Sequence, residues 1–246
     1  MTSPKTRPSC TPYRSEFRTS SSISQEYFVP VDTPPRSYGF QSPGILALRL
    51  DRPNGRIKTS KGINDKVADG ATLNSTMYGN YTFEVLGPRI SGIVTAIVII
   101  APEGDEIDIE LLGGDPHCWQ SNVFVPHPSD KEPLYGVFAG RHCYKPSSRS
   151  HSASTDTVDS YHLYTVDWNP EKIIWGVDGI HVRTLRREDT IKNGVYHFPS
   201  NPARIQLGIW DASFPSGTSA WARGPVNWRT APASMSAFAR SVRIEC

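Results

Sequence analysis

Three acidic residues, Glu106, Asp108 and Glu110, alternate along one short segment of the chain. Ile107 and Ile109 separate them, and in a β-strand every second side chain faces the same way, so the three carboxylates are expected on one face. Carboxylates this close repel one another, which raises the pKa of at least one of them and keeps it protonated near neutral pH. One ionised and one protonated carboxyl group are what retaining cleavage of a glycosidic bond requires.

Strand geometry sets a condition on this chemistry. Positions 106 and 110 lie roughly 13 Å apart along a flat strand, whereas retaining carboxyl pairs lie about 5–5.5 Å apart. The strand must therefore be concave on its acidic face, and a strongly curved sheet is expected. Taken alone, an E-x-D-x-E segment also fits a solvent-facing acidic strand or a calcium site, so the rest of the chain has to decide.

Short apolar runs separated by Gly- and Pro-containing turns predict an all-β sandwich or jelly roll. The expected strands are 45–50, 78–85, 92–101, 106–112, 120–125, 134–141, 161–168, 172–177, 181–185, 203–210 and 236–246. Only residues 189–193 are expected to form a short helix. Residues 1–40 are rich in Ser, Thr, Pro and Arg and predict a poorly structured arm before one domain at 41–246.

Composition argues against several partners. The 26 basic and 24 acidic residues give a net charge of +2 without a basic patch for nucleic acid. The sequence contains no run of 18 apolar residues, so no membrane span is predicted. No signal peptide is visible in the first 30 residues. Neither a metal nor a cofactor is expected, because metal-ligand spacing is missing among His117, His127, His142, His162 and His181.

Several segments resemble one enzyme family. The acidic strand follows Gly-Asp and precedes Leu-Gly-Gly-Asp. It is accompanied by Y-H-x-Y-x-x-D-W at 161–168, I-W-x-x-D-G-x-x-V-R at 174–183, Q-L-G-I-W-D at 206–211, W-A-R-G-P-V-N-W at 221–228 and S-V-R-I-E-C at 241–246. Over residues 70–246 the chain resembles glycoside hydrolase family 16. It is most similar to the fungal cell-wall transglycosylases that crosslink chitin to glucan.

The resemblance implies a concanavalin-like β-jelly-roll sandwich of two curved antiparallel sheets. It implies that Glu106 is the nucleophile, Asp108 its assisting carboxylate and Glu110 the general acid/base. The substrate would be a β-linked cell-wall glucan or chitin, cleaved by double displacement. A monomer acting outside the cell, at the cell wall, is expected.

Glycan binding is expected from aromatic and amide side chains. Trp210 and Trp221 would stack on sugar rings, and Gln120 and Asn122, which face the same way on the next strand, could bind sugar hydroxyls. Two other tryptophans, Trp168 and Trp175, could lie equally well in the core or in the groove. One position departs from the family, because Arg223 stands where a small glycine is expected.

Two functional classes fit these features. The first is an enzyme that transfers a glycosyl group to water or to another sugar, with the choice between glucan and chitin left open. The second is a non-catalytic, lectin-like module on the same fold. The intact acidic triad favours the enzyme, since a lectin has no use for three clustered carboxylates.

The cysteines allow an inference from spacing. If strands 120–125 and 134–141 form a hairpin centred near Asp130, position 118 falls opposite 142 or 143, within disulfide reach. A Cys118–Cys143 bond is therefore predicted, which implies an oxidising, secreted setting; reduced thiols in a cytosolic protein are the alternative. The sequons at Asn74 and Asn80 give weak support to secretion.

Overall fold

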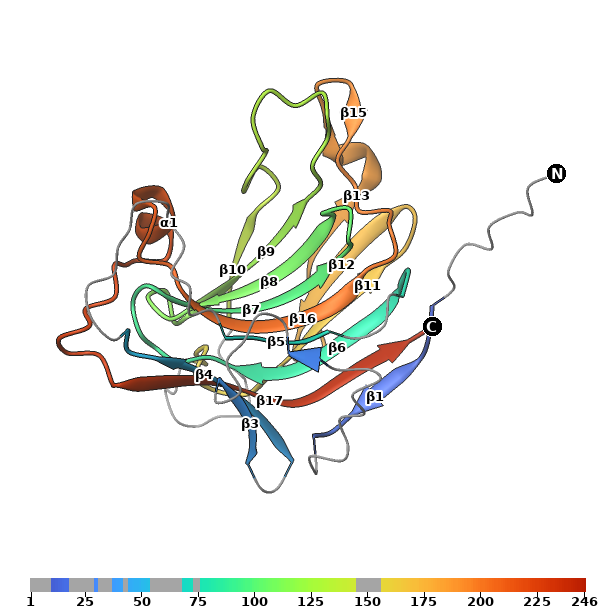
Figure 1. The fold of residues 1–246 in the computed structure, drawn as a ribbon. Coiled ribbons are helices and arrows are strands. Elements are labelled where there is room, and N and C mark those ends of the chain that lie inside the picture. Colours follow the sequence, from blue (N-terminus) through green and yellow to red (C-terminus); the bar gives the residue numbers. More distant parts are fainter. Residues whose placement is uncertain are drawn as a thin grey trace.

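The computed structural model describes residues 10–17, 29–30, 37–41, 44–53, 68–72, 76–144 and 156–246. Within these residues, two large antiparallel sheets pack face to face (Figure 1). The back sheet has the order β13-β12-β11-β6-β17-β4-β3, with β1 added beside β17, and the cleft sheet has the order β10-β9-β8-β7-β16-β5-β2. The predicted all-β sandwich is confirmed.

The strands of the two sheets have the following bounds. In the back sheet they are β1 Tyr13–Ser15, β3 Tyr38–Gln41, β4 Ile45–Asp51, β6 Gly79–Leu86, β11 His162–Trp168, β12 Lys172–Val177, β13 Ile180–Arg186 and β17 Ser234–Glu245. In the cleft sheet they are β2 Val29–Pro30, β5 Ala68–Thr72, β7 Ile93–Ile100, β8 Glu106–Leu112, β9 Cys118–Phe124, β10 Gly140–Cys143 and β16 Arg204–Asp211. A small hairpin joins β14 Ile191–Lys192 to β15 Val195–Tyr196.

The core lies between the two sheets and is filled by alternate residues of their strands. Ile107 and Ile109 on β8 are each 1% exposed, as the alternation predicts. Trp168 and Trp175 are also buried there, so both are core residues and neither faces a groove. Because the isoleucines of β8 point inward, its acidic residues must point to the outer face of the cleft sheet.

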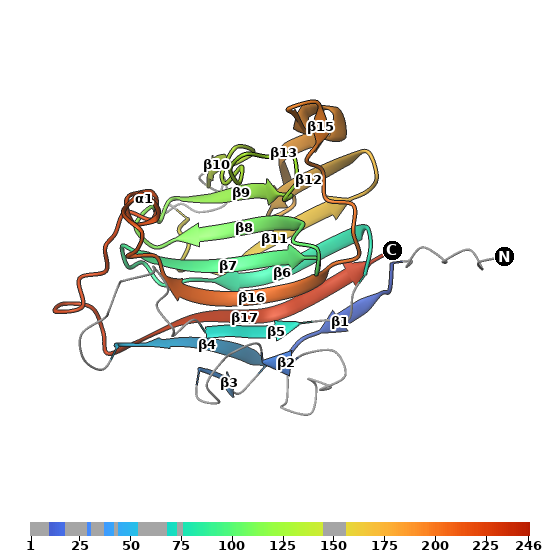
Figure 2. The same ribbon diagram turned by 45° about the horizontal axis from the view of Figure 1, so that its top comes forward.

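The outer face of the cleft sheet is concave. Strands β7, β8 and β16 bend along their length in Figure 1, and Figure 2 shows them lying side by side across the middle of the sheet. Sheets twist and coil because of the handedness of their residues, and here the coiling turns the acidic face inward. The predicted curvature of the sheet, concave on its acidic face, is present.

Most expected strands match the observed ones within a few residues, but the sequence did not predict the short strands β1, β2, β3, β5, β14 and β15, and three further segments differ. Residues 135–138 form turns, and only Gly140–Cys143 pairs as β10. The expected short helix at 189–193 is a 3-10 turn, η2 Arg187–Thr190, and a helix that the sequence did not predict, α1, covers Ser216–Trp221. The segment S-G-T-S-A-W of α1 contains mostly weak helix formers, so it carries little local signal.

Part of the segment expected to be a loose arm is packed onto the domain. Strand β1 pairs with β17, Phe17 is fully buried in the core, and a disulfide joins Cys10 to Cys246. For residues 10–17 the structure therefore differs from the expectation, because one aromatic anchor and one crosslink suffice to order a polar segment. Asn74 lies outside the described residues, and Asn80 is half-buried in β6. In the part of the chain described, no helix is long and apolar enough to cross a membrane.

The predicted hairpin disulfide is confirmed. In the β9–β10 pair Cys118 lies directly opposite Cys143, and the two sulfurs are bonded across a Cα–Cα distance of 3.9 Å. The paired positions centre the hairpin beside Asp130, as predicted. All four cysteines are therefore in disulfides.

Replacing Cys118 and Cys143 together by Ala is expected to lower the free energy of unfolding by about 3 kcal/mol. The bond joins positions 25 residues apart and so restricts the unfolded chain. Urea unfolding followed by tryptophan fluorescence measures the difference. Peptide mapping without reduction should recover the two cysteines in one crosslinked peptide, and their recovery as free thiols from natively produced protein would rule the bond out.

Candidate active site

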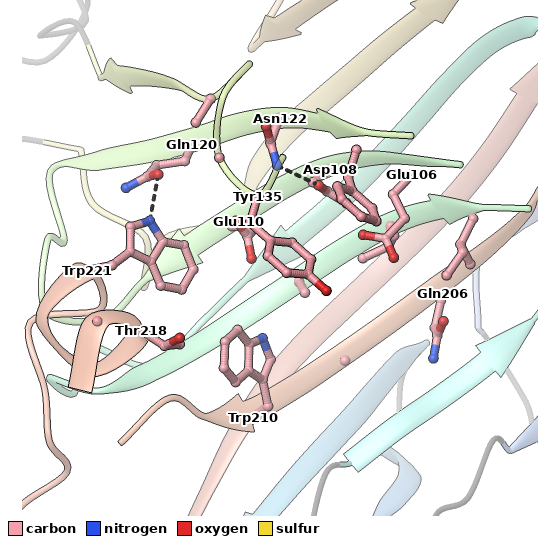
Figure 3. Close-up of a pocket in the computed structure, with 18 residues that line it drawn as sticks. Glu106, Asp108, Glu110, Gln120, Asn122, Tyr135, Gln206, Trp210, Thr218 and Trp221 are labelled. Atoms are coloured by element: carbon pink, nitrogen blue, oxygen red, sulfur yellow. Dashed lines mark hydrogen bonds between the residues drawn. The ribbon is translucent and has the colours of Figure 1, made fainter. Parts of the chain in front are cut away.

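A cleft of about 710 Å³ lies on the concave face of the cleft sheet (Figure 3). Strands β7, β8, β9 and β16 form its floor, and residues from the β9–β10 loop and from α1 complete its lining. The three acidic residues of β8 lie in the middle of this floor, and Glu106, Asp108 and Glu110 all line the cleft.

Antiparallel register arranges the floor in rows that run across the strands. Each row has one residue from β9, β8, β7 and β16, in that order. The first row is Gln120, Glu110, Ala96 and Gly208, and the second is Asn122, Asp108, Val98 and Gln206. The third row is Phe124, Glu106, Ile100 and Arg204. Every member except Arg204 lines the cleft. Each carboxylate thus has an apolar neighbour on β7, which removes water on that side, while two of the three have an amide neighbour on β9.

Asp108 is the most strongly perturbed of the three carboxyl groups. Burial raises its pKa well above the usual range, and the charges of Glu110 and Glu106 raise it further. Asn122 Nδ2 donates a hydrogen bond of 3.3 Å to Asp108 Oδ2, which acts in the opposite direction. The other oxygen, Asp108 Oδ1, is buried and has no hydrogen-bond partner in the described part of the chain. Burial and the two neighbouring charges therefore favour the protonated form of Asp108, and its Oδ1 has a free position for one more hydrogen bond.

Glu110 and Glu106 differ in a way that suits two chemical roles. Burial raises the pKa of Glu110 to about 7, with the charge of Glu106 as the second cause. The pKa of Glu106 is also raised, by burial alone. Glu110 can hold a proton at neutral pH and release it readily. Two carboxyl groups whose surroundings separate their pKa values are the arrangement of an acid and a nucleophile.

Aromatic pairs stand at the two ends of the cleft. Beyond Glu110, the rings of Trp210 and Trp221 stack with centroids 6.0 Å apart and planes 22° apart. Trp221 comes from α1, and its Nε1 donates a hydrogen bond of 2.9 Å to Gln120 Oε1. Beside Glu106, Phe124 and Tyr135 stack with centroids 4.8 Å apart and planes 18° apart. Flat rings placed along a polar cleft suit a ligand that has both apolar faces and hydroxyl groups.

Buried carboxylates outside the cleft hold its parts in place. Asp105 is 4% exposed and accepts hydrogen bonds from the backbone N–H groups of Ser200 (2.8 Å) and Asn201 (3.2 Å). This ties the start of β8, next to Glu106, to the segment that leads into β16. Asp211, directly after Trp210, accepts a hydrogen bond of 3.0 Å from Trp228 Nε1 and so holds together the two ends of the segment that carries α1.

The structure brings together all the residues that the sequence proposed for the site. Glu106, Asp108, Glu110, Gln120, Asn122, Trp210 and Trp221 all line the one cleft. Their chemical roles remain predictions.

The sequence analysis overlooked several lining residues. Phe124 continues the face of Gln120 and Asn122, and Gln206 continues the face of Trp210, so alternation could have found both. Thr218 and Tyr135 lie on a helix and a loop that gave no periodic signal. Among the described residues, no cluster of His, Cys, Asp or Glu could hold a metal ion.

The sequence comparison identifies the family. The model of the glycosyl hydrolases family 16 matches residues 41–231. The chain belongs to this family. The "Probable glycosidase CRR1" of Eremothecium gossypii is 32% identical over 175 residues, which cover 68% of this chain and 36% of that protein. "Crh-like protein 2" of Aspergillus fumigatus is 33% identical over 156 residues, covering 61% of this chain and 32% of that protein. The chain thus spans about a third of the length of these relatives.

Solved structures of family 16 share the fold. A "Crh5 transglycosylase in complex with NAG" superimposes with a TM-score of 0.73 at 22% identity, covering 97% of this chain and 85% of the other. A Bacillus licheniformis beta-glucanase gives a TM-score of 0.69 at 19% identity, covering 96% and 98%. The predicted class, a jelly-roll sandwich of two curved antiparallel sheets, is confirmed.

The raised pKa of Glu110 predicts a pH-dependent stability. Unfolded, this carboxyl group has a pKa of about 4.3; folded, it has a pKa of about 7. The folded state therefore retains a proton that the unfolded chain releases, and the stability that this gives below pH 4 is lost as the pH rises through 7. Glu110→Gln removes this loss. The difference in free energy of unfolding between this variant and the wild type should therefore shift in favour of the variant by roughly 3 kcal/mol when the pH is raised from 4 to 8.

Urea unfolding at pH 4 and pH 8 measures this gain. Glu103→Gln, the same substitution at an exposed position outside the cleft, is the matched control and should show no comparable gain. A difference between Glu110→Gln and wild type that is the same at both pH values would contradict the raised pKa.

Proposed function

We propose that this protein is a retaining glycosidase or transglycosylase that cleaves β-linked cell-wall glucan or chitin by double displacement. The observation that carries the proposal is the row of three carboxyl groups, with Asp108 buried and Glu106 and Glu110 half-buried, in a cleft with aromatic ends, and the pKa of Glu110 is raised to about 7. Retaining enzymes need one ionised and one protonated carboxyl group. Related structures named a beta-glucanase and a transglycosylase in complex with NAG support this class of substrate.

In the first step, the Glu106 carboxylate attacks the anomeric carbon and forms a glycosyl ester. The bond from that carbon to the bridging oxygen breaks, and Glu110 donates its proton to the departing oxygen. Asp108, whose pKa is raised by burial and by the charges of Glu110 and Glu106, hydrogen-bonds to the nucleophile and tunes its charge. Asn122, bonded to Asp108 Oδ2, fixes which oxygen carries the proton.

In the second step, Glu110 is a carboxylate and acts as the general base. It takes a proton from water or from the hydroxyl group of a second sugar, whose oxygen attacks the anomeric carbon and releases Glu106. Water gives hydrolysis, and a sugar gives a new glycosidic bond. Both proton transfers use the same carboxyl group, so its pKa near neutrality suits each direction.

The other cleft residues bind the glycan chain. Trp210 and Trp221 stack on the apolar C–H faces of sugar rings, while Gln120 and Asn122 bind hydroxyl groups. The protein acts as a monomer outside the cell, at the cell wall. Two disulfides support this setting, because such bonds persist in oxidising compartments.

Glu106→Gln and Glu110→Gln are expected to differ on an activated aryl glycoside. Glu106→Gln should abolish turnover, since no glycosyl ester can form. Glu110→Gln should keep glycosylation of the enzyme by a substrate whose leaving group needs no protonation. Release of the aryl group, followed by absorbance, measures both. If the two variants behave alike on this substrate, the division of roles is wrong.

The reaction itself is tested by incubating wild type with labelled laminari- and chito-oligosaccharides and weighing the products by mass spectrometry. Shorter products alone mean hydrolysis, and longer products mean transfer to sugar. Binding without any product, in wild type and Glu106→Gln alike, would instead indicate the lectin-like module.

Trp210→Ala should weaken glycan binding about tenfold while leaving the fold intact, because the ring is only partly buried at the cleft surface. Trp175→Ala is the matched control: that ring is fully buried, so its loss should lower the free energy of unfolding by about 3–5 kcal/mol. Calorimetric titration and urea unfolding separate the two effects. A large loss of stability in Trp210→Ala would show that it is a core residue.

A further inference from the structure

The loop between β9 and β10 borders the cleft, and its middle is tied to a distant part of the chain. Asp130 accepts a hydrogen bond of 2.9 Å from His197 Nε2 and another of 3.3 Å from Asn193 Nδ2. Asn193 lies in the turn between β14 and β15, and His197 directly follows β15. Figure 1 shows this loop and the β14–β15 hairpin projecting next to each other from the same end of the molecule.

This tether is buried to a degree that loop side chains seldom reach. The side chain of His197 is fully buried and that of Asp130 is 5% exposed. The hydrogen bond from His197 holds the pKa of Asp130 below its usual range, so the carboxylate is ionised and only accepts. Removing either partner would leave the other buried without its main hydrogen bond, which makes the contact a firm constraint on the loop.

The loop is fixed at a second point near its end. Arg183 Nη2 donates a hydrogen bond of 2.6 Å to the backbone oxygen of Phe138, and Arg183 Nη1 donates one of 3.2 Å to that of Ser121 on β9. Phe138 itself is buried. The segment between Asp130 and Phe138 is therefore held at both ends.

Tyr135 is the side chain that this doubly held segment presents to the cleft. It is 75% exposed, yet it lines the cleft and stacks on Phe124, whose strand neighbour is Glu106. Figure 3 shows its ring projecting toward the row of carboxylates. With so little of its own surface packed, the ring depends on the loop for its position.

We propose that Asp130 and His197 are positioning residues that hold Tyr135 at the Glu106 end of the cleft and thereby set the affinity for long glycan chains over short ones. The inference rests on the proposed function. A short activated glycoside occupies the floor around the three carboxyl groups, whereas a longer β-linked chain also runs along the Phe124–Tyr135 pair beside the Glu106 row. The tether therefore acts on binding of the outer sugar units and leaves the bond-breaking groups unchanged.

A double-mutant cycle with Tyr135 tests this coupling. Asp130→Ala and Tyr135→Ala should each raise KM for a long oligosaccharide about three- to tenfold, the range expected for one aromatic contact. If Asp130 acts through Tyr135, the double variant should be no worse than Tyr135→Ala. kcat and KM on a short aryl glycoside should stay within about twofold in Asp130→Ala, which lies outside the cleft lining. Lys131→Ala, the adjacent exposed position, is the control and should match the wild type.

Amide hydrogen exchange gives a readout that does not depend on activity. Asp130→Ala should speed exchange in residues 134–139 at least several-fold relative to Lys131→Ala, because the loop has lost one of its two fixed points. Asn193→Ala, which removes only the longer of the two hydrogen bonds, should act in the same direction and is expected to fold even if Asp130→Ala does not.

The proposal would be overturned if hydrogen exchange were unchanged in these variants. It would also be overturned if the double variant raised KM by the product of the factors for Asp130→Ala and Tyr135→Ala. Failure of the wild type to cleave any glycan would instead overturn the proposed function, while the exchange measurement still decides whether the tether positions the loop.

Discussion

Repulsion among three carboxyl groups on one face of β8 is the interaction that the surrounding structure has to accommodate. Their acidic face opposes folding, since all three pKa values are raised by burial. The strand is held instead by its other face, where Ile107 and Ile109 are buried, and by ladders to β7 and β9 on both sides. A central strand with an apolar inner face can carry this strain, whereas an edge strand could not. The position of the acidic segment in the sheet is therefore part of its chemistry.

The register between neighbouring strands determines which side chains lie beside each carboxyl group of β8. Because β7 and β9 pair with β8, and β16 pairs with β7, without a bulge across the acidic segment, every carboxyl row continues into a defined neighbour on each side. Asn122 meets Asp108 in this way, and Gln120 lies beside Glu110 and accepts the hydrogen bond of Trp221. A slip of one residue in either pairing would turn these amides into the core. The same ladders that stabilise the sheet thus define which polar group faces which acid.

Some residues of the cleft could be predicted from the sequence and others could not. The two groups differ in whether local sequence or distant contacts determine their positions. Alternation of period two is a local property, and it located β8, its inward isoleucines and the outward amides of β9. The Cys118–Cys143 bond followed from the same rule, because a hairpin's centre fixes its pairs. Tyr135, Thr218 and α1 belong to segments whose conformation is set by distant contacts, such as Asp130 with His197 and Asp211 with Trp228. Phe17 is ordered by packing against the core and by the nearby Cys10–Cys246 bond, neither of which its neighbours in sequence predict.

The two ends of the cleft are built on different supports, and this has a consequence for specificity. The Trp210–Trp221 end is carried by β16 and by a helix tied through Gln120 to the floor itself, so its geometry follows that of the strands that carry the carboxyl rows. The Phe124–Tyr135 end combines a floor residue with a loop residue whose support lies outside the cleft, at the β14–β15 hairpin. Changes in that hairpin can therefore move one end of the cleft without disturbing the carboxyl rows. Under the proposed function, selection of chain length can vary independently of bond cleavage, since the three carboxyl groups on β8 and Tyr135 on the β9–β10 loop are anchored to different elements.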